Sequence, residues 1–394
     1  MGNDSGLALG APGDAAEVRA YADIVVQALF WPPLDEEDWA AEIGPGNIRL
    51  AREGGRVVAG LAFWRFGQWF GGRSVPAAGI TAVAAAPDVR GGGIMGALLR
   101  RTLADLRDEG FPLAVLYPST QPVYRRAGFE QAGSRIGYRL PAQALDARDR
   151  ALAVHPLAAA DGDAVRALYA ARAERTAGNL DRNEPLWARL LSPRPPAYGY
   201  LVEGDNGPEG YVVYRQRQTP GRLAGDIRAL DLVSLTPAAG RRLLTFFADH
   251  RSMIDAVSWY GAPADPLFTL VANQAHTVEW RMEWLLRVVD VRAALAGRGY
   301  PPDLETEVHL AVRDEVCPWN DGRFVLAVAD GRGEVREGGR SDVILDARGL
   351  AALYSGYLSP AALQQVGLAA GEPRALAAAG LPFAGPAPWM PDMF

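Results

Sequence analysis

The chain has 394 residues, of which 49% are hydrophobic and 22% are charged. This composition is typical of a folded globular protein and excludes a collagen, a coiled coil or a disordered chain as the main state. The 40 Lys and Arg residues against 46 Asp and Glu give a formal net charge of -6, so the field of the whole chain repels polyanions and we expect no nucleic-acid partner.

The N-terminal residues carry no targeting signal. Residues 1–14 lack the basic and apolar blocks of a signal peptide, and no segment approaches the ~18 apolar residues of a membrane span. We therefore expect a cytoplasmic protein without a membrane span. The single cysteine, Cys317, excludes an internal disulfide, and the four scattered histidines lack the spacing of metal ligands, so we expect no metal site.

At roughly 150 residues per domain, the chain length predicts two or three domains. Residues 1–148 have the pattern of a mixed α/β domain. The predicted helices cover residues 15–29, 95–109 and 122–126, and the predicted strands cover residues 48–51, 57–63, 79–85 and 113–117.

A similar but weaker order recurs over residues 149–286. Its predicted helices cover residues 163–175 and 238–248, and its strands cover residues 198–202, 211–214 and 229–235. The pattern of residues 287–394 predicts an α+β unit. Its strands cover residues 310–314, 324–328 and 343–346, and its helices cover residues 348–354 and 360–365. The last residues combine prolines with apolar side chains, including Trp389, Met390 and Phe394, which favours an ordered strap over a disordered tail.

The strongest local signal lies in residues 83–96, where a predicted strand meets Arg90-Gly91-Gly92-Gly93 and then a helix. Glycines let a backbone approach a pyrophosphate closely, and the first turn of a helix presents free N–H groups. The segment lacks both the dinucleotide motif G-x-G-x-x-G and the Lys-Ser/Thr of a P-loop. It indicates either another kind of anion-binding turn or a flexible turn that caps the helix. The second domain has Ala238-Ala239-Gly240-Arg241 at the corresponding place, so we expect it to keep the fold without this site.

A second motif follows the strand over residues 113–117: Ser119, and then Tyr124 at the start of Tyr-x-x-x-Gly-Phe. Together with Pro87-x-x-Arg90-x-x-Gly93 and its helix, it resembles the GCN5-related N-acetyltransferases (GNAT), which bind acetyl-CoA where two parallel strands separate. The weaker second copy, a C-terminal unit similar to sterol carrier proteins and a final phenylalanine resemble the Eis (enhanced intracellular survival) family. This resemblance covers nearly the whole chain and implies tandem GNAT domains, the first of them active.

The resemblance also implies a site for acetyl-CoA. Backbone groups of Val83 and Ala85 would pair with the pantetheine arm, and Arg90, Gly91, Gly92, Gly93 and Ile94 would surround the pyrophosphate. Ser119 would contact CoA, with a simple helix N-cap as the alternative role. The family usually has further basic residues where this chain has Gly91 and Gly92, so we expect backbone N–H groups to contribute more of the phosphate binding.

Tyr124 matches the family's general acid, because a phenol with a pKa near ~10 can give a proton to the departing CoA thiolate. A tyrosine that merely packs on its helix is the alternative. In the family the base is the C-terminal α-carboxylate, here that of Phe394, and a pKa of about 3.5 suits it to acting through water. An inert terminus is the alternative. Cys317 lies far along the chain from these motifs, so we expect direct transfer rather than an acyl-cysteine.

The resemblance further implies that the acceptor is an amino group of a cationic small molecule such as an aminoglycoside, and that the protein assembles as a hexamer. The acidic residues 35–38 could face this amine or form a solvated loop. Two other functions stay open. An enzyme of the same fold could acetylate a protein or peptide lysine or a biosynthetic amine, and a non-catalytic protein could bind lipid or CoA.

Overall fold

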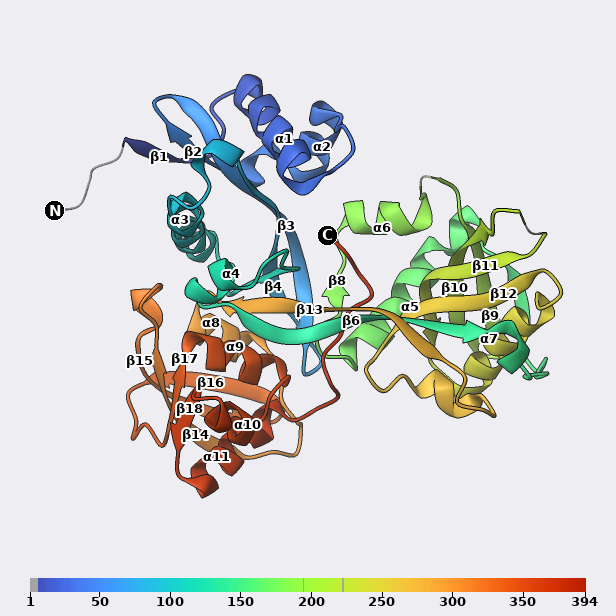
Figure 1. Ribbon diagram of the computed structural model, residues 1–394. Helices are drawn as coiled ribbons and strands as arrows, with labels where there is room; N and C mark the ends of the chain where they lie inside the picture. Colours follow the sequence, from blue (N-terminus) through green and yellow to red (C-terminus); the bar gives the residue numbers. More distant parts are fainter. Residues whose placement is uncertain (1–5, 194, 222) are drawn as a thin grey trace.

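The computed structural model describes residues 6–193, 195–221 and 223–394, so the predicted start of the first domain at residue 1 lies outside it. In this part of the chain, thirteen strands form one large sheet and five form a smaller one. The large sheet runs through two α/β halves, and the C-terminal α+β part lies against the first half (Figure 1). This is the predicted fold class. No helix within the described ranges is long and apolar enough to cross a membrane.

The first half begins with a helix whose ends and buried face follow from its sequence. The side chain of Asp14 accepts a hydrogen bond from the Glu17 N–H and so caps α1 (Ala15–Leu29), and the helix buries Val18, Tyr21 and Val25. The other elements of this half are β1 (Leu7–Gly10), α2 (Glu36–Ile43), β2 (Ile48–Glu53), β3 (Arg56–Phe70), β4 (Arg73–Ala85), α3 (Ile94–Asp108), β5 (Leu113–Leu116), α4 (Pro122–Arg126) and β6 (Glu130–Pro141).

The acidic residues 35–38 start a helix instead of forming a loop. Asp35 is the N-cap of α2, and its side chain accepts a hydrogen bond of 3.0 Å from the Asp38 N–H. Glu36, Glu37 and Asp38 lie in the first turn, where the positive end of the helix dipole favours carboxylates. Their charge is therefore explained by the helix end that they stabilise.

The second half repeats this order, as predicted. It contains β7 (Ala153–Pro156), α5 (Gly162–Glu174), β8 (Leu180–Asp181), α6 (Glu184–Leu191), β9 (Tyr198–Gly204), β10 (Gly207–Gln218), β11 (Gly225–Ser234), α7 (Pro237–Asp249), β12 (Ile254–Gly261) and β13 (Thr277–Val288). The parallel pair β11–β12 corresponds to the parallel pair β4–β5 of the first half. The sequence did not predict β7, β8, α6, β12 and β13.

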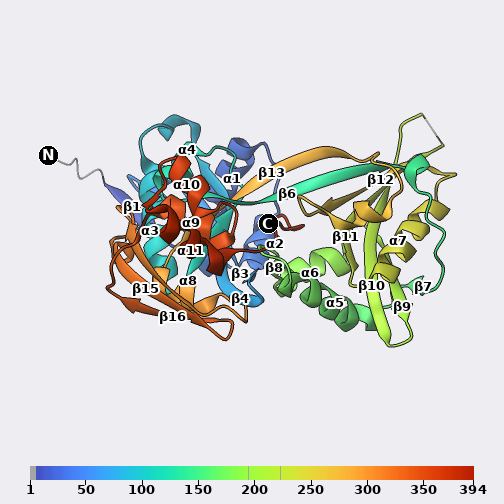
Figure 2. The same cartoon turned by 90° about the horizontal axis from the view of Figure 1, so that it is seen from below.

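The two halves exchange their last strands. β13 of the second half lies between β5 and β6, and β6 of the first half lies between β13 and β12. These two long strands connect the halves as an antiparallel ribbon (Figure 2). The predicted domain boundaries after residues 148 and 286 stay predictions. One continuous sheet crosses the first boundary, and residue 286 lies within β13.

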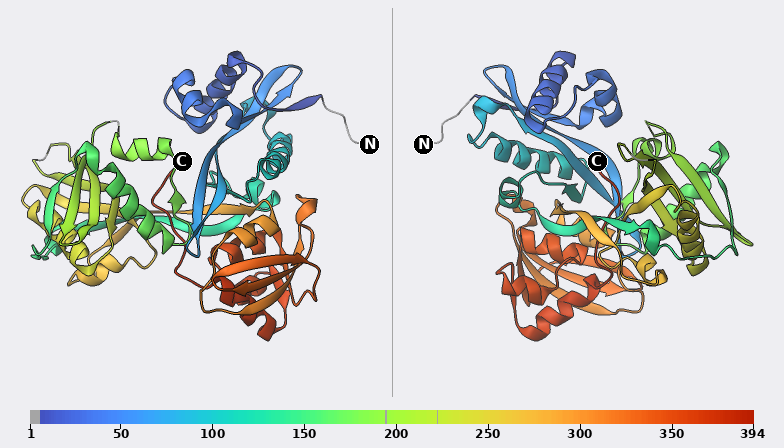
Figure 3. Two further views of the ribbon diagram at one scale, coloured as in Figure 1. Left: turned by 180° about the vertical axis from the view of Figure 1, so that it is seen from behind. Right: turned by 45° about the vertical axis from the view of Figure 1, so that its right-hand side comes forward.

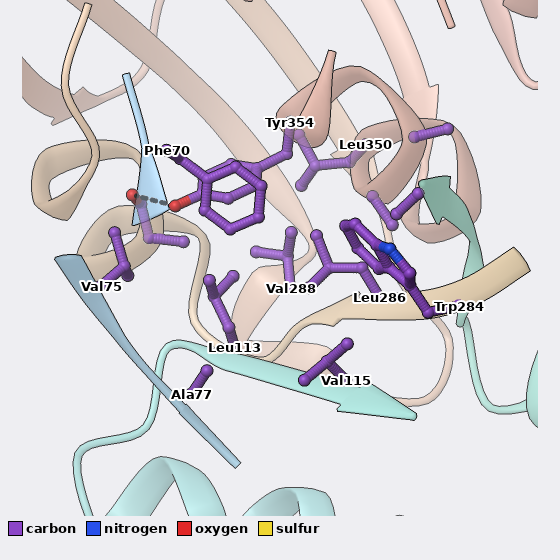
Figure 4. Close-up of a cluster of buried hydrophobic side chains, with 14 of the residues drawn as sticks. Phe70, Val75, Ala77, Leu113, Val115, Trp284, Leu286, Val288, Leu350 and Tyr354 are labelled. Carbon is purple, nitrogen blue, oxygen red and sulfur yellow. Dashed lines mark hydrogen bonds between the residues drawn. The ribbon is translucent and has the colours of Figure 1, made fainter. Parts of the chain in front are cut away.

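The C-terminal part contains α8 (Val291–Gly297), β14 (Thr306–Arg313), β15 (Gly322–Ala329), β16 (Arg332–Glu337), β17 (Val343–Asp346), α9 (Ala347–Ser355), α10 (Pro360–Gln365), β18 (Ala369–Gly371) and α11 (Pro373–Gly380). Helix α9 packs on β6 and β13. Leu350 and Tyr354 of α9 lie with Leu286 of β13 in one buried cluster, and the Tyr354 ring lies edge-on to Phe70 at 5.1 Å (Figure 4). The C-terminal part and the first half therefore share a hydrophobic core.

Candidate active site

The site starts where β4 and β5 separate. These parallel strands pair over three residues each, from Ala77–Leu113 to Gly79–Val115. The pairing of β3 with β4 then shifts by one residue, and Ala82 has a φ of +51°, which is uncommon for a residue with a side chain. The buried hydroxyl of Tyr21 donates a hydrogen bond of 2.5 Å to the Ala82 carbonyl. This contact stabilises the bend that directs the end of β4 away from β5.

A pocket of about 620 Å³ lies at this separation. It contains the predicted Tyr124 together with most of the residues predicted to bind the cofactor. Its described lining consists of Ala28, Leu29, Val83, Ala84, Ala85, Val89, Arg90, Gly91, Gly93, Ile94, Met95, Gly96, Arg100, Ser119, Thr120, Val123, Tyr124, Arg126 and Ala127. Of the predicted residues, Gly92 lies outside this lining and faces an adjacent hollow that it shares with Arg90, and Phe394 lies elsewhere.

The glycine-rich turn requires glycine at two positions. Gly91 and Gly93 have φ of +85° and +81°, in the left-handed region that side chains disfavour. Gly93 is the N-cap of α3 and offers no side chain to the first N–H groups of the helix, which stay free for a ligand. In the second half, by contrast, the hydroxyl of Thr236 accepts a hydrogen bond of 3.1 Å from the Ala239 N–H at the start of α7. The corresponding helix end there is already capped.

Two arginines that were not predicted complete the pocket. Arg100 of α3 and Arg126 of α4 line it together with Arg90, and none of its described lining residues has a carboxylate side chain. The pocket thus contains positive side chains besides Arg90, although Gly91 and Gly92 carry none. Arg100 follows Gly96 by four residues on the same face of α3, and both residues line the pocket.

Tyr124 points into a desolvated part of the pocket. Its side chain is almost fully buried and lies edge-on to Phe129, with ring centroids 6.1 Å apart. Burial raises the pKa of Tyr124 to about 12, and a hydrogen bond with Ser119 partly offsets this rise. The phenol is therefore protonated at neutral pH. Ser119 does not cap α4, since the N-cap of that helix is Gln121.

The C-terminal residues form an ordered strap between the two halves (Figures 1 and 3), as their apolar composition indicates. Trp389 forms a parallel bridge with Ser134 of β6, and its carbonyl accepts a hydrogen bond of 2.8 Å from Asn179. Met390 is fully buried. Near the end, the carboxylate of Asp392 binds Arg182 at 2.8 Å. Contacts from both halves thus hold the strap as far as Asp392.

Phe394 lies on the face of the sheet opposite Tyr124. Its ring packs against Phe66 and Tyr117, with centroids 5.0 and 5.6 Å away, while Tyr124 belongs to the cluster under α3 and α4. The Thr81 hydroxyl donates a hydrogen bond of 3.3 Å to the Phe394 backbone oxygen. A side chain at Gly79 would meet this ring at 2.9 Å, so the glycine makes room for it. Phe394 and Tyr124 therefore approach the bent end of β4 from opposite sides.

Cys317, the remaining candidate for a catalytic nucleophile, is unsuited to covalent catalysis. Its side chain is fully buried in the cluster beneath α3, and burial raises the pKa of the thiol. The reactive thiolate is thus disfavoured. Within the described ranges, no three His, Cys, Asp or Glu side chains come together as a possible metal site.

Comparison with known proteins identifies each part of this fold. Models of the acetyltransferase (GNAT) domain match residues 12–132 and 178–288, and a model of the sterol carrier protein domain matches residues 291–391. An uncharacterized N-acetyltransferase of Streptomyces avermitilis is 33% identical over 96% of this chain and 95% of its own length. The N-acetyltransferase Eis of Mycobacterium tuberculosis is 29% identical over 84% of this chain and 82% of its own.

A solved structure agrees over almost the full length. The GCN5-related N-acetyltransferase from Anabaena variabilis superposes with a TM-score of 0.93, at 36% identity, over 98% of this chain and 100% of that one. The tandem GNAT halves, the C-terminal sterol-carrier unit and the matches in sequence agree with one another. This chain is an N-acetyltransferase and belongs to the Eis family of GCN5-related N-acetyltransferases.

Proposed function

We propose that this enzyme binds acetyl-CoA in the pocket between β4 and β5 and transfers the acetyl group directly to an amine. One observation supports this most strongly: the pocket combines the free start of α3, guanidinium groups and the buried phenol of Tyr124. The N–H groups at Gly93 and Ile94, with Arg90, Arg100 and Arg126, would bind the phosphates of CoA. Val83 and Ala85 lie beyond the bend in β4 and would pair with the pantetheine amides as an added strand does.

In the proposed reaction the amine nitrogen attacks the thioester carbonyl, the C–N bond forms and the C–S bond breaks. Tyr124 donates a hydrogen bond, and then a proton, to the departing CoA sulfur. A phenol with a pKa of about 12 is a weaker acid than a thiol in water. Because the sulfur departs into the same buried site, its pKa rises for the same reason, and the two groups come closer in acidity.

The acceptor would enter from the opposite face, at Phe394. The amine must lose a proton to attack, and we propose that the terminal carboxylate accepts it, directly or through a water. Our proposed acceptor is a cationic small molecule such as an aminoglycoside, since a carboxylate at the site and a net charge of -6 both attract cations. From the family resemblance we further propose a cytoplasmic homo-hexamer.

Tyr124→Phe tests the acid. The substitution keeps the ring that packs on Phe129 and removes the hydroxyl, so kcat is expected to fall roughly 10²-fold or more while CoA affinity stays unchanged. The measurement is steady-state thiol release with calorimetric CoA binding. Tyr138→Phe, which removes a hydroxyl bonded to the Ala262 carbonyl in the second half, is the control and should keep kcat. Normal turnover in Tyr124→Phe with a fast acceptor would remove Tyr124 from the mechanism.

Gly93→Asp and Gly93→Asn test the phosphate site as a matched pair. A Cβ atom at this position meets nothing within 4 Å, and both substitutions place a side chain of the same shape at φ +81°. Only aspartate adds a negative charge at the proposed pyrophosphate position, so CoA should bind at least ~10-fold more weakly to Gly93→Asp than to Gly93→Asn. Equal CoA affinity in the two folded variants, measured by calorimetry, would show that the phosphates bind elsewhere.

The terminal carboxylate is tested by comparing three forms of the protein, made by ligation of the C-terminal peptide. Amidation removes the proton acceptor while the Phe394 ring keeps its contacts with Phe66 and Tyr117. One added residue moves the carboxylate by about 3.3 Å. Both changed forms should lose most activity and keep the melting temperature. A fully active amide would refute the role of the carboxylate, whereas parallel loss of activity and stability would indicate a structural strap.

The acceptor class is tested by thiol release from acetyl-CoA with matched panels of aminoglycosides, linear polyamines, lysine peptides and neutral biosynthetic amines. Aminoglycosides are expected to give the highest kcat/KM. Faster turnover of lysine peptides or neutral amines would replace the proposed acceptor while leaving the acetyltransferase chemistry intact. Absence of both CoA binding and turnover would favour the non-catalytic alternative.

A further inference from the structure

The second half contains a pocket that acetyl transfer does not use. It has a volume of about 410 Å³, within the range of small-molecule sites. We propose that it binds a small multivalent oxyanion, that is, a molecule with clustered phosphate or carboxylate groups. Its described lining consists of Arg135, Gly137, Arg139, Arg217, Asp226, Arg228, Ala229, Ser258, Trp259, Tyr260, Glu279 and Trp280.

Strand alternation places the polar residues on one face of the sheet. On β11 and β12, Ile227 and Val257 point into the apolar cluster that contains α7, so their neighbours Arg228 and Ser258 point the other way. Arg228 and Arg139 both pair with Ser258 across the sheet, from its two sides. The floor of the pocket is therefore a serine between two arginines.

The corresponding face of the sheet in the first half is apolar. There β5 and β13 present Leu113, Val115, Leu286 and Val288, which α9 covers (Figure 4). At this face, the sheet of the second half carries Arg139 of β6, Arg217 of β10 and Arg228 of β11 instead of apolar residues. The difference indicates a surface that is built to remain open to a polar ligand.

The positive charges exceed what the neighbouring carboxylates neutralise. Arg139 is paired with Asp226 at 2.6 Å and lies 3.7 Å from Glu279. Within the described residues, the side chain of Arg217 makes no hydrogen bond or ion pair, although Asp226 stands opposite it on β11. The Arg228 side chain donates a hydrogen bond to the Tyr260 hydroxyl and lies near the Tyr260 ring. In addition, Arg215 of β10 stands directly opposite Arg228. Like charges at such positions are unfavourable, and a bound anion would offset this cost.

A fourth guanidinium group, that of Arg135, borders the pocket in a fixed position. Arg135 lies over the Tyr260 ring at 3.5 Å and near the Trp280 ring at 5.1 Å, and its Nε donates a hydrogen bond of 2.7 Å to the Pro391 carbonyl of the strap. Its terminal nitrogens remain available for a bidentate contact. Stacking and this bond orient the group before a ligand arrives, which lowers the entropy cost of binding.

This pocket is not a remnant of a second acetyl-CoA site. A CoA site in this half would lie at the start of α7, on the other face of the sheet, where Thr236 caps the helix. The pocket also differs in charge from the proposed acceptor site, since a cationic amine would be repelled by Arg135, Arg217 and Arg228. It is best described as a separate anion site beside the strap.

The test is calorimetric titration of the full-length enzyme, saturated with CoA so that the first pocket is filled, with pyrophosphate and with citrate at constant ionic strength. One site per chain is expected for at least one of these probes, and the stronger probe shows whether phosphate or carboxylate is preferred. Arg217→Gln/Arg228→Gln should weaken binding at least ~10-fold. Arg292→Gln/Arg336→Gln, which removes two arginines from the C-terminal part, should not.

A second pair guards against a variant that fails to fold. Ser258→Asp and Ser258→Asn have the same shape, and only the aspartate should abolish binding, with CoA affinity and melting temperature as checks on the fold. Saturable binding that is unaffected in both test variants would place the anion elsewhere. The absence of saturable heat in the wild type up to about 10 mM of either probe would overturn the proposal.

Discussion

The short parallel pairing of β4 and β5 is the constraint on which the rest of the site depends. Because the strands separate after Gly79 and Val115, the backbone beyond the bend at Ala82 is free to meet a ligand on one face. The same separation lets the C-terminal strap approach from the other face, where Thr81 contacts its last residue. The bond from Tyr21 to the Ala82 carbonyl stabilises this geometry from within the core. The pocket on one side of β4 and the position of the strap on the other therefore both follow from one irregularity in one strand.

In the second half the start of α7 is capped by Thr236, and the contacts of this half instead hold the C-terminal strap. Arg182 is buried between two carboxylates, Asp231 of β11 and Asp392 of the strap. Burial alone would raise the pKa of Asp231, but the guanidinium groups of Arg182 and Arg172 hold it below its usual range. A buried charge left without its partner is costly, so this network ties the strap to the second half. The second half thus helps to place the terminal residues for which we propose a role beside β4 of the first half.

The sequence was most informative where structure follows from local rules. The glycine turn, its helix and Tyr124 were predicted, because positive φ, helix ends and short motifs depend on neighbours along the chain. Arg100 and Arg126 were missed, since their meeting with Arg90 depends on how α3 and α4 pack. β13 was also missed, although Glu279, Arg281 and Glu283 alternate with larger apolar residues in a typical strand pattern. No local pattern could show that this strand joins the other half, because the exchange depends on contacts remote in sequence.

The exchange of β6 and β13 affects how the protein must be made. While the ribosome synthesises the second half, β5 has no partner on one side, since its neighbour β13 has not yet been translated. An unpaired strand edge can associate with other chains, and contacts between distant segments slow folding. The first half thus cannot finish folding before the second is synthesised, in contrast to tandem domains that mature one after another. The exchange of β6 and β13 therefore makes the two halves a single folding unit, in which neither half can complete its sheet alone.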